Sequence, residues 1–457
     1  RWACTKENDW NFWGHGGLGT PIVVFNPLAW SRAIPVQLGR PAANITDDLG
    51  VSVPVQRVRA SRTNQADKWD SLFLASVPAM GWRTYWVYLE SCETTEVSNE
   101  LAAGEDFIEN EFLRLTIDPN TGYIAGLYDK STGREILAGP GAVPFVIDVE
   151  HCDTWGHSVF SFRDEFGRFA RARITLLESG PVRTVLRMES FYGASVLRQD
   201  FILYAGAKQV EIRARLDWRE RFKLLKLSFP VRVSGTPRAV CDIPFGHIER
   251  RADGREEFGQ MWFDGSDENG GLTVLNDGKY AFDMLGGDMR MTVANSSLYA
   301  DHFAGEHRDE LCEYMDQGVQ EFRYALRPHA GGCPWADIAK AAISLNTEET
   351  HIAETYHAGP LPLCYSGIEV AADNVIVTAV KPAQDGSGII VRAYEAGAGD
   401  TETELRLSFL DRSFRARFPQ NGVKTFRVQK GTNAPVVECD FMENAIFEEN
   451  KEDKVFG

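Results

Sequence analysis

The sequence predicts an all-β protein, because strand patterns fill most of its 457 residues and helical periodicity is scarce. Apolar and polar residues alternate with a period of two in many segments, and short apolar runs are interrupted by Gly, Asp, Asn and Pro. A chain of this length holds roughly two to four domains. So many strands before the first helix imply a large antiparallel sandwich, flanked by smaller β-sandwich domains.

The first β domain is predicted over residues 21–91, after an upstream region and linker at 1–20. Pro21 to Trp30 contains the apolar run I-V-V-F and then an Asn-Pro turn, which is typical of a strand and its end. Trp82 to Leu89 alternates large and polar residues and is expected to close this small sandwich. Residues 92–106 are rich in Glu, Thr and Ser, so we interpret them as a linker.

The large sandwich is predicted over residues 107–334. Phe112 to Ile117 is a strand, and Tyr123 to Leu127 returns after a turn in which Gly122 supplies a positive φ. In Gln209 to Leu216, apolar residues alternate with Glu and Arg, which indicates one buried and one solvated face. Further strands are expected at Ala172–Leu177, Val182–Met188 and Leu224–Phe229.

The best helical pattern is Trp335 to Leu345, where apolar residues recur at i, i+3, i+4 and i+7 after two glycines and a proline. We expect this helix to lie in a connector over residues 335–366. Residues 367–445 then form a C-terminal sandwich, and residues 446–457 an acidic, disordered tail.

Within that C-terminal sandwich, Gly367 to Val380 and Gly388 to Tyr394 are expected to form a hairpin across a Pro- and Gly-containing turn. Leu405 to Leu410 and Val423 to Val428 add strands.

Charge and cysteine usage exclude several classes of partner. The formal net charge of −17 argues against nucleic acid and anionic membranes, because both require a positive surface. No apolar run is long enough to span a membrane. The eight cysteines are spread singly without a C-x-x-C pair, so we expect free thiols in a reducing compartment rather than a structural zinc site or a disulfide framework. These features favour a cytoplasmic protein.

Several motifs, in order, resemble the C-terminal half of the bacterial-type α-mannosidases of glycoside hydrolase family 38. They are F-N-P-L-A-W-S-R from Phe25, E-N-E-F-L-R-L-T-I-D from Glu109, C-D-T-W-G-H from Cys152 and G-G-L-T-V-L-N-D-G-K-Y-A-F-D from Gly270. The resemblance covers nearly the whole chain and implies that its large sandwich is similar to mutarotase-like supersandwiches. Two departures, M-T-V-A-N-S-S from Met291 and Gln320 in place of a His, place the chain in a divergent branch.

The resemblance also implies a division of labour. The family's chemistry is a retaining double displacement by two carboxyl groups, with zinc or another divalent cation holding the sugar hydroxyls. Its nucleophile and metal ligands lie in an N-terminal barrel and a helical region whose motifs this chain does not contain. We therefore assign no catalytic residue, no metal ligand and no cofactor to this chain, and expect it to be inactive alone. The expected partners are that N-terminal catalytic domain and an α-mannoside.

The first candidate site is the segment from His151 to His157. Three interpretations remain open: a structural turn at Gly156, a sugar-facing wall formed by Asp153 and Trp155, and a metal site formed by His151, Asp153 and His157 if the segment is a strand. An aromatic ring beside a carboxylate suits a sugar, so Asp153 and Trp155 are carried as candidate substrate-binding residues.

The second candidate is the turn Asn276-Asp277-Gly278-Lys279-Tyr280. Amide, carboxylate, ammonium and phenol groups hydrogen-bond vicinal hydroxyls well, and the resemblance brings this turn near the barrel's active site. Asn276, Asp277, Lys279 and Tyr280 are therefore candidate substrate-binding residues, although Asp-Gly is also a plain turn signal.

The acidic pair Glu256 and Glu257 is a weaker candidate for acid/base chemistry, because neighbouring like charges push one pKa upward. The alternative is a solvated loop in which both carboxylates form ion pairs with nearby arginines.

Two functions from different classes follow. The chain is either the accessory half of an α-mannosidase or a free-standing carbohydrate-binding or mutarotase-like module. The sequence upstream of Arg1 would discriminate, since an open frame with His-x-Asp near its start supports the first.

Overall fold

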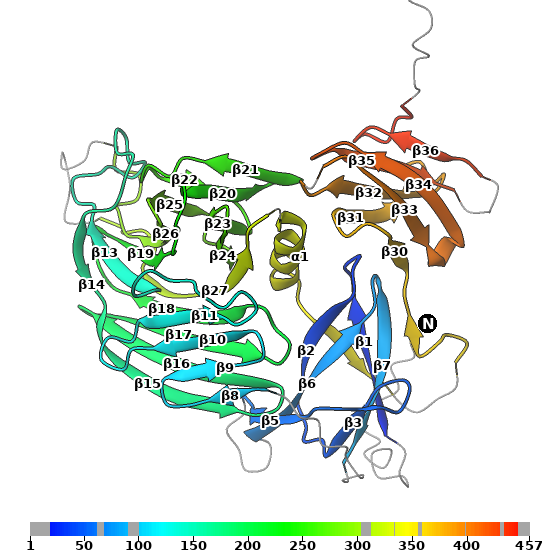
Figure 1. Ribbon diagram of the computed structural model, residues 1–457, viewed down its shortest axis with the longest axis horizontal. Helices are drawn as coiled ribbons and strands as arrows, with labels where there is room; N and C mark the ends of the chain where they lie inside the picture. Colours follow the sequence, from blue (N-terminus) through cyan, green and yellow to red (C-terminus); the bar gives the residue numbers. More distant parts are fainter. Residues whose placement is uncertain are drawn as a thin grey trace, which may run out of the picture.

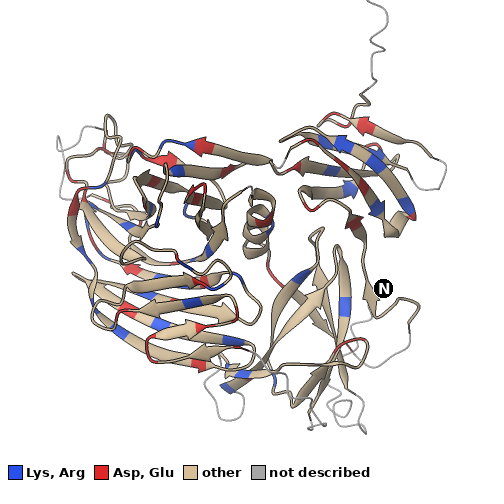
Figure 2. Cartoon of the chain, in the orientation of Figure 1, with Lys and Arg blue, Asp and Glu red and all other residues tan. Residues whose placement is uncertain are grey.

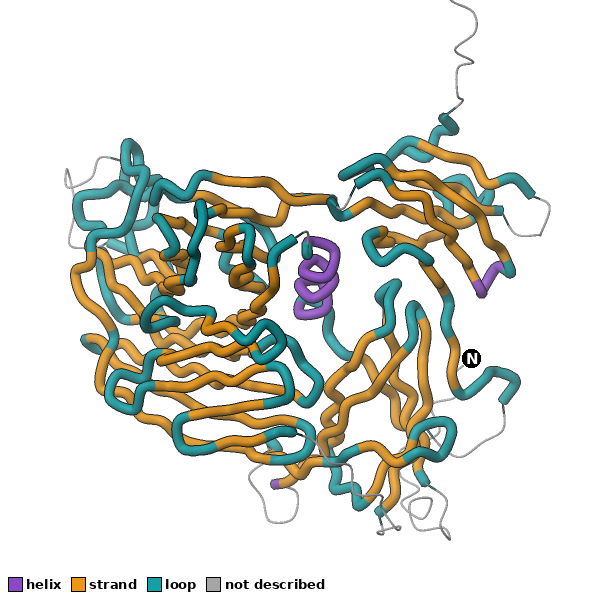
Figure 3. Tube along the Cα trace, viewed as in Figure 1, coloured by secondary structure: helices purple, strands orange, loops and turns teal. Residues whose placement is uncertain are grey.

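The structure, a computed structural model, describes residues 19–61, 68–89, 100–302, 312–332, 334–354, 359–397, 399–429 and 434–446. It is built almost entirely of antiparallel strands, as Figure 3 shows, which confirms the predicted all-β class. Most of the predicted 92–106 linker, the upstream residues 1–18 and the tail from 447 lie outside the described residues.

The first sandwich packs a six-stranded sheet against a three-stranded sheet. Strand β1 pairs with β7, which confirms that Trp82–Leu89 closes this domain. The six-stranded sheet also takes two strands, β28 and β29, from the segment that follows the helix, so the predicted connector contributes to this sandwich as well. The strands are β1 (Thr20–Asn26), β2 (Arg32–Leu38), β3 (Asn44–Thr46), β4 (Ser52–Val53), β5 (Gln56–Arg59), β6 (Trp69–Val77), β7 (Gly81–Tyr88), β28 (Thr350–Ala353) and β29 (Cys364–Tyr365).

The large sandwich contains sheets of nine, six and five strands. The nine-stranded sheet has the order β15-β16-β17-β18-β27-β24-β23-β20-β21, and the six-stranded sheet has the order β14-β13-β19-β26-β25-β22. Apolar side chains from all three sheets form one continuous core. In β18 the residues Val210, Ile212, Ala214 and Leu216 are buried and their neighbours are not, as the alternation predicts.

The hairpin predicted at Phe112–Leu127 is present as β10 and β11 in the five-stranded sheet. The strands of the large sandwich are β8 (Ala102–Ala103), β9 (Phe107–Glu109), β10 (Leu113–Ile117), β11 (Ile124–Asp129), β12 (Arg134–Glu135), β13 (Val143–Asp148), β14 (Glu165–Arg168), β15 (Ala170–Ser179), β16 (Arg183–Tyr192), β17 (Ser195–Tyr204), β18 (Val210–Trp218), β19 (Lys223–Pro230), β20 (Arg238–Ile243), β21 (Gly246–Arg250), β22 (Glu257–Phe258), β23 (Trp262–Asp267), β24 (Gly270–Asn276), β25 (Ala281–Leu285), β26 (Asp288–Asn295) and β27 (Gly318–Ala330).

Helix α1 (Trp335–Leu345) has the predicted bounds and lies between the three sandwiches (Figure 1). One side of it, including Ile338, packs on the outside of the nine-stranded sheet. Another side, including Ala339, packs against Ile376 and Tyr394 of the C-terminal sandwich. Because both faces are buried, α1 joins the domains rather than lying on the surface.

The C-terminal sandwich consists of a three-stranded and a four-stranded sheet. The strand predicted over Gly367–Val380 is wrong as one element: it divides at a turn near Asn374 into β30, which pairs with β33, and β31, which pairs with β32. The side chain of Asn374 holds this turn by donating to Glu395 and Thr401. The elements are β30 (Ile368–Val370), β31 (Val375–Pro382), β32 (Ile389–Glu395), β33 (Thr401–Leu407), η3 (Ser408–Leu410), β34 (Arg412–Phe418), β35 (Val423–Val428) and β36 (Val436–Cys439).

Charged side chains of both signs are distributed over the molecule. Lys and Arg are interspersed with Asp and Glu across all three sandwiches (Figure 2). Among the described cysteines, Cys152, Cys241, Cys364 and Cys439 are free. Among the described helices none is both long and apolar enough to cross a membrane.

Candidate functional site

The turn after β24 divides into a part that holds the turn and a part that faces outward. Asn276 is buried, and its Oδ1 accepts the backbone N–H groups of Gly278 (3.1 Å) and Lys279 (2.9 Å). Its Nδ2 donates to the carbonyl of Gln260 (2.9 Å). These bonds occupy the amide in both directions, so Asn276 acts on the turn itself rather than on a ligand.

Asp277 is also committed to the protein. Its Oδ1 accepts the backbone N–H of Arg323 (2.8 Å), and its Oδ2 pairs with the Arg323 guanidinium (3.0 Å). Arg323 lies on β27, the neighbour of β24, so this pair fastens the turn to the nine-stranded sheet.

Lys279 is half-buried, and Tyr280 is exposed. The ammonium of Lys279 donates to Gln320 (3.0 Å) and lies over the Phe322 ring, 5.0 Å from its centroid. Burial lowers the pKa of Lys279. Tyr280 is 53% exposed. Among the four candidate residues of the turn, these two are the ones positioned to meet a ligand, and their binding role stays a prediction.

The segment from His151 to His157 forms a turn, not a strand, and Gly156 has the positive φ of 63° that this turn requires. Asp153 is buried and accepts the backbone N–H of His157 (2.9 Å) on Oδ1. Its Oδ2 lies 2.5 Å from Nδ1 of His157. Trp155 is 59% exposed. The predicted metal site of His151, Asp153 and His157 is therefore wrong. It required an extended strand, in which odd-numbered residues point to the same face.

A second loop, residues 296–302, takes the place that His151 was expected to fill. Thr154 connects the two loops: its backbone N–H donates to the carbonyl of Asp301 (2.8 Å), and its hydroxyl donates to the carbonyl of Leu298 (2.6 Å). These bonds bring His302 beside His157 and Trp155, with ring centroids 5.3 and 5.7 Å apart respectively. Asp153, His157 and His302 each offer a ligand atom within 4.8 Å of the others.

Hydrogen bonds connect the two candidate regions. Gln320, the partner of Lys279, donates to the carbonyl of Asp316 (2.8 Å). The Asp316 carboxylate accepts the backbone N–H of Asn295 (2.8 Å), at the start of the loop that Thr154 binds. The turn of Lys279 is thus joined to the loop that Thr154 binds by a chain of hydrogen bonds through Gln320 and Asp316.

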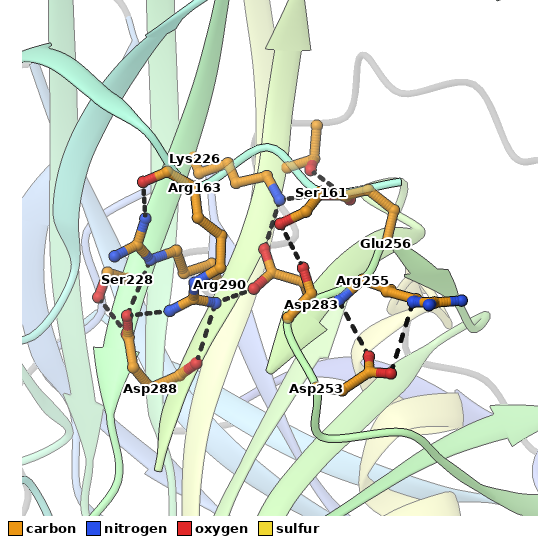
Figure 4. Close-up of polar contacts among 12 residues, drawn as sticks. Ser161, Arg163, Lys226, Ser228, Asp253, Arg255, Glu256, Asp283, Asp288 and Arg290 are labelled. Atoms are coloured by element: carbon orange, nitrogen blue, oxygen red, sulfur yellow. Dashed lines mark hydrogen bonds and ion pairs between the residues drawn. The ribbon is translucent and has the colours of Figure 1, made fainter. Parts of the chain in front are cut away.

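The outer face of the six-stranded sheet carries a network of ion pairs (Figure 4). Lys226 on β19, whose side chain is fully buried, pairs with Asp283 and with Glu256. Arg163 pairs with Asp283 and with Asp288 (2.5 Å). Burial lowers the pKa of Lys226 to about 8. Both oxygens of Asp283 are therefore taken by cations from the protein.

This network answers the question raised by Glu256 and Glu257. Glu256 is an anchor for the buried ammonium of Lys226 and also accepts from Thr292 (3.4 Å), while Glu257 lies 3.6 Å from Arg250. Both carboxylates form ion pairs, as the alternative interpretation predicts. Glu256 differs from that interpretation in one respect: its partner is a buried lysine rather than an arginine of the same loop. The two carboxylates therefore form ion pairs with different partners.

A cavity of about 940 Å³ lies elsewhere, where the two small sandwiches meet α1. Its lining includes Trp30, Met80, Trp82, Met261 and Ile343 and contains no ionisable side chain. It is a gap between domains, without an acid or base that could transfer a proton.

Sequence reasoning missed His302 and Lys226. His302 had no local signal, because its partners are about 150 positions away. Lys226 did have one: it interrupts the apolar run L-L-K-L-S-F in a strand whose two faces are both buried.

Comparisons with known proteins agree with these observations. Residues 108–303 match the glycosyl hydrolases family 38 C-terminal domain, and residues 374–455 match the family 38 C-terminal beta sandwich domain. The chain is 27% identical over 350 residues to alpha-mannosidase G of Dictyostelium discoideum, covering 72% of this chain and 31% of that protein. It is 27% identical over 384 residues to alpha-mannosidase 2C1 of Homo sapiens, covering 78% and 35% respectively.

The fold is also shared with a solved structure, an alpha-mannosidase from Enterococcus faecalis V583, at a TM-score of 0.72 and 15% identity. That match covers 90% of this chain and 56% of the other. The chain spans about a third of the length of the curated relatives it matches.

Proposed function

The chain belongs to glycoside hydrolase family 38, two of whose C-terminal domain models it matches, and we propose that it forms the C-terminal part of an α-mannosidase. The relatives named above are α-mannosidases, which supports this substrate class. In this proposal a partner catalytic domain supplies the nucleophile, the acid and a divalent cation for retaining hydrolysis. The chain described here supplies polar and aromatic groups that orient the glycoside.

One observation carries the proposal: the turn after β24 holds an exposed phenol, Tyr280, and a half-buried ammonium, Lys279, on a rigid base. Asn276 and Asp277 are saturated by hydrogen bonds within the protein, so the backbone of the turn is held in place. Lys279 and Tyr280 are left to meet a sugar. A rigid base matters because misplacing a substrate by about 1 Å can cost on the order of a hundredfold in rate.

The chemistry of the two side chains suits hydroxyl groups. The Lys279 ammonium has three donors, one of which Gln320 uses, and the Tyr280 hydroxyl can both donate and accept. The exposed ring of Trp155, two residues from the buried Asp153, offers an apolar plate for the C–H face of a sugar ring. Neither set contains an acid and a nucleophile facing one another, so binding and orientation are the roles we assign.

The proposal predicts that Lys279→Ala and Tyr280→Phe lower kcat/KM about tenfold in an enzyme that joins this chain to its catalytic domain. The loss of one positioning hydrogen bond from the transition state, at about 1.4 kcal/mol, gives that factor. Steady-state kinetics on an aryl α-mannoside and on a mannose disaccharide measure it. Tyr128→Phe, which changes an exposed tyrosine on β11 of a different sheet, is the matched control.

Unchanged kcat/KM in both turn variants on both substrates would contradict the binding role of the turn. Trp155→Ala, made in the same enzyme, then separates the two candidate regions, because it changes the aromatic plate and leaves the turn intact.

We also propose that the chain alone does not hydrolyse α-mannosides. Purified protein is assayed with an aryl α-mannoside with and without added zinc, and no turnover above the buffer rate is expected. Chelator-sensitive turnover would overturn this proposal. A free-standing binding module is distinguished by titration with mannose, which such a module binds without the catalytic domain.

A cytoplasmic location is proposed on the free thiols. Among the described cysteines, Cys152, Cys241 and Cys439 are buried free thiols. Unpaired buried thiols suit a reducing compartment. Fractionation of a bacterial host that expresses the natural gene is the test, and recovery in the periplasm would contradict it.

A further inference from the structure

We propose that Asp153, His157 and His302 form a binding site for a divalent transition metal ion on the large sandwich, with Zn²⁺ as the probe. One carboxylate and two imidazoles are a common zinc donor set. One ligand atom from each of the three side chains lies within 4.8 Å of the other two. The site does not depend on the proposed function, because it lies within this chain and metal binding is measured without catalysis.

The carboxylate of the site is held in place before any ion binds. Asp153 is buried, and the backbone N–H of His157 donates to its Oδ1 (2.9 Å), while the backbone N–H of Gly156 donates to its carbonyl (3.2 Å). Its Oδ2 lies 2.5 Å from Nδ1 of His157, so the carboxylate and the imidazole already face one another. A cation would bind between them, with each ligand atom about 2.0–2.2 Å from the ion.

The third ligand arrives from a loop distant in sequence, and the structure shows what holds it there. Thr154 accepts the backbone N–H of Asp301 (2.7 Å) on the same hydroxyl that donates to Leu298, and its own N–H donates to the Asp301 carbonyl. This clamp fixes residues 301 and 302 beside the 153–157 turn. The imidazoles of His157 and His302 consequently meet edge to face, with ring planes 88° apart.

Charge and exposure favour a cation. In the part of the chain that the structure describes, the Asp153 carboxylate contacts His157 and no Lys or Arg, whereas Asp283 is paired with two cationic side chains. The His157 side chain is 62% exposed, so an ion from solvent can reach it. Three protein ligands leave at least one coordination position for water or for a hydroxyl group.

The test is metal titration of the purified, tag-free chain. Isothermal calorimetry with Zn²⁺ is expected to show one equivalent bound, and Co²⁺ is expected to give visible absorption bands from mixed N/O coordination. His302→Ala and Asp153→Asn should each weaken Zn²⁺ binding at least about tenfold, a loss at the low end of what orienting groups around a metal cause. Bound Zn²⁺ should also raise the Tm of the native chain and not that of His302→Ala.

The matched control is His151→Ala, which removes an exposed imidazole from the same turn without touching the three ligands. It should bind Zn²⁺ as the native chain does. The proposal is overturned if no Zn²⁺ binds at micromolar concentration, if His302→Ala binds as tightly as the native chain, or if His151→Ala weakens binding as much as His302→Ala. Circular dichroism of each variant confirms folding, and His157→Gln replaces any variant that fails this check.

Discussion

The large sandwich carries two polar clusters that look alike in composition and differ in how completely the protein satisfies them. In the ion network on the six-stranded sheet, Lys226 pairs with Asp283 and Glu256, and Arg163 pairs with Asp283 and Asp288. In the loop cluster, the Asp153 carboxylate is bonded to the imidazole and the backbone N–H of His157, and no Lys or Arg pairs with it among the residues described. A high density of charged side chains is therefore a poor guide to a ligand site. A carboxylate that no cationic side chain of the protein pairs with is a better one.

The two clusters also differ in the elements that carry them. Lys226, Asp283 and Arg290 lie on strands β19, β25 and β26, where their neighbours point into the main core. Asp153, His157 and His302 lie on loops at the surface. Loops carried by a rigid scaffold are where binding groups concentrate, because they reach solvent without disturbing a core. The network fastens the loops of Arg163 and Glu256 to the sheet, whereas the loop cluster is where we propose that an ion binds.

The largest effect is expected from Lys226→Ala, which should lower the free energy of unfolding by about 3–5 kcal/mol, because it leaves the buried Asp283 without one of its two cations. Urea denaturation measures this change. The variant that remains folded should bind Zn²⁺ as the native chain does, since Lys226 does not contact the loop cluster.

A double variant, Lys226→Met with Asp283→Leu, separates two effects of Lys226→Ala: the buried charge left without its partner and the loss of side-chain packing. Replacing both charges by apolar groups should recover much of the stability, because no fully buried charge is left without a partner: Arg163 keeps Asp288, and Glu256 is partly exposed. A loss of under about 1 kcal/mol in Lys226→Ala would show that the network is dispensable and would remove the contrast between the two clusters.

A second prediction concerns Asp242, a buried carboxylate on β20. Burial shifts its pKa, and no cationic side chain among the described residues opposes the shift. Burial raises its pKa to about 6, and a hydrogen bond from the backbone N–H of Met261 (3.0 Å) opposes that shift only in part. The folded protein then binds a proton more tightly than the unfolded chain. The contribution of Asp242 to the free energy of unfolding is therefore most favourable at low pH, and it falls as the pH rises from about 4 through 6.

Asp242→Asn keeps the acceptor for Met261 and removes the charge, so it should raise the free energy of unfolding at pH 7.5 by at most about 3 kcal/mol. The gain should shrink as the pH falls toward 4. Thermal denaturation at pH 4.5, 6 and 7.5 measures it, with Asp267→Asn as control. Asp267 accepts three backbone N–H groups that hold its pKa at about 2, so its replacement should destabilise at neutral pH. A gain of equal size at all three pH values would contradict the assignment.

The smallest effects come from the two halves of the turn after β24. Asn276→Ala should cost about 1–3 kcal/mol, because the carbonyl of Gln260 and the N–H groups of Gly278 and Lys279 lose a buried partner. Tyr280→Phe should change stability by less than about 0.5 kcal/mol, because the side chain is exposed. Differential scanning calorimetry compares them. Equal losses would show that Tyr280 is also a structural residue, and would weaken its proposed role in binding.

Short sequence patterns were enough to predict many of the secondary-structure elements. Helix α1 begins and ends at Trp335 and Leu345 as predicted, because its apolar spacing and its flanking breakers are contained within about 15 residues. The β10–β11 hairpin was likewise predicted from one turn. The division of Gly367–Val380 into β30 and β31 was not, since each half pairs with a different sheet and Asn374 turns the chain between them.

The sequence by itself determined the all-β class, the place of the helix and the family resemblance, because these depend on residue periodicity and on short motifs that neighbouring positions encode. It also pointed to the two regions around Asp153 and around Lys279. Only the tertiary structure decided which side chains in those regions are free to act: Arg323 occupies Asp277, and Thr154 brings His302 to His157 in place of His151. Such contacts join positions tens to well over a hundred residues apart, and strand pairing, which sets those distances, is not written in any local window of the chain.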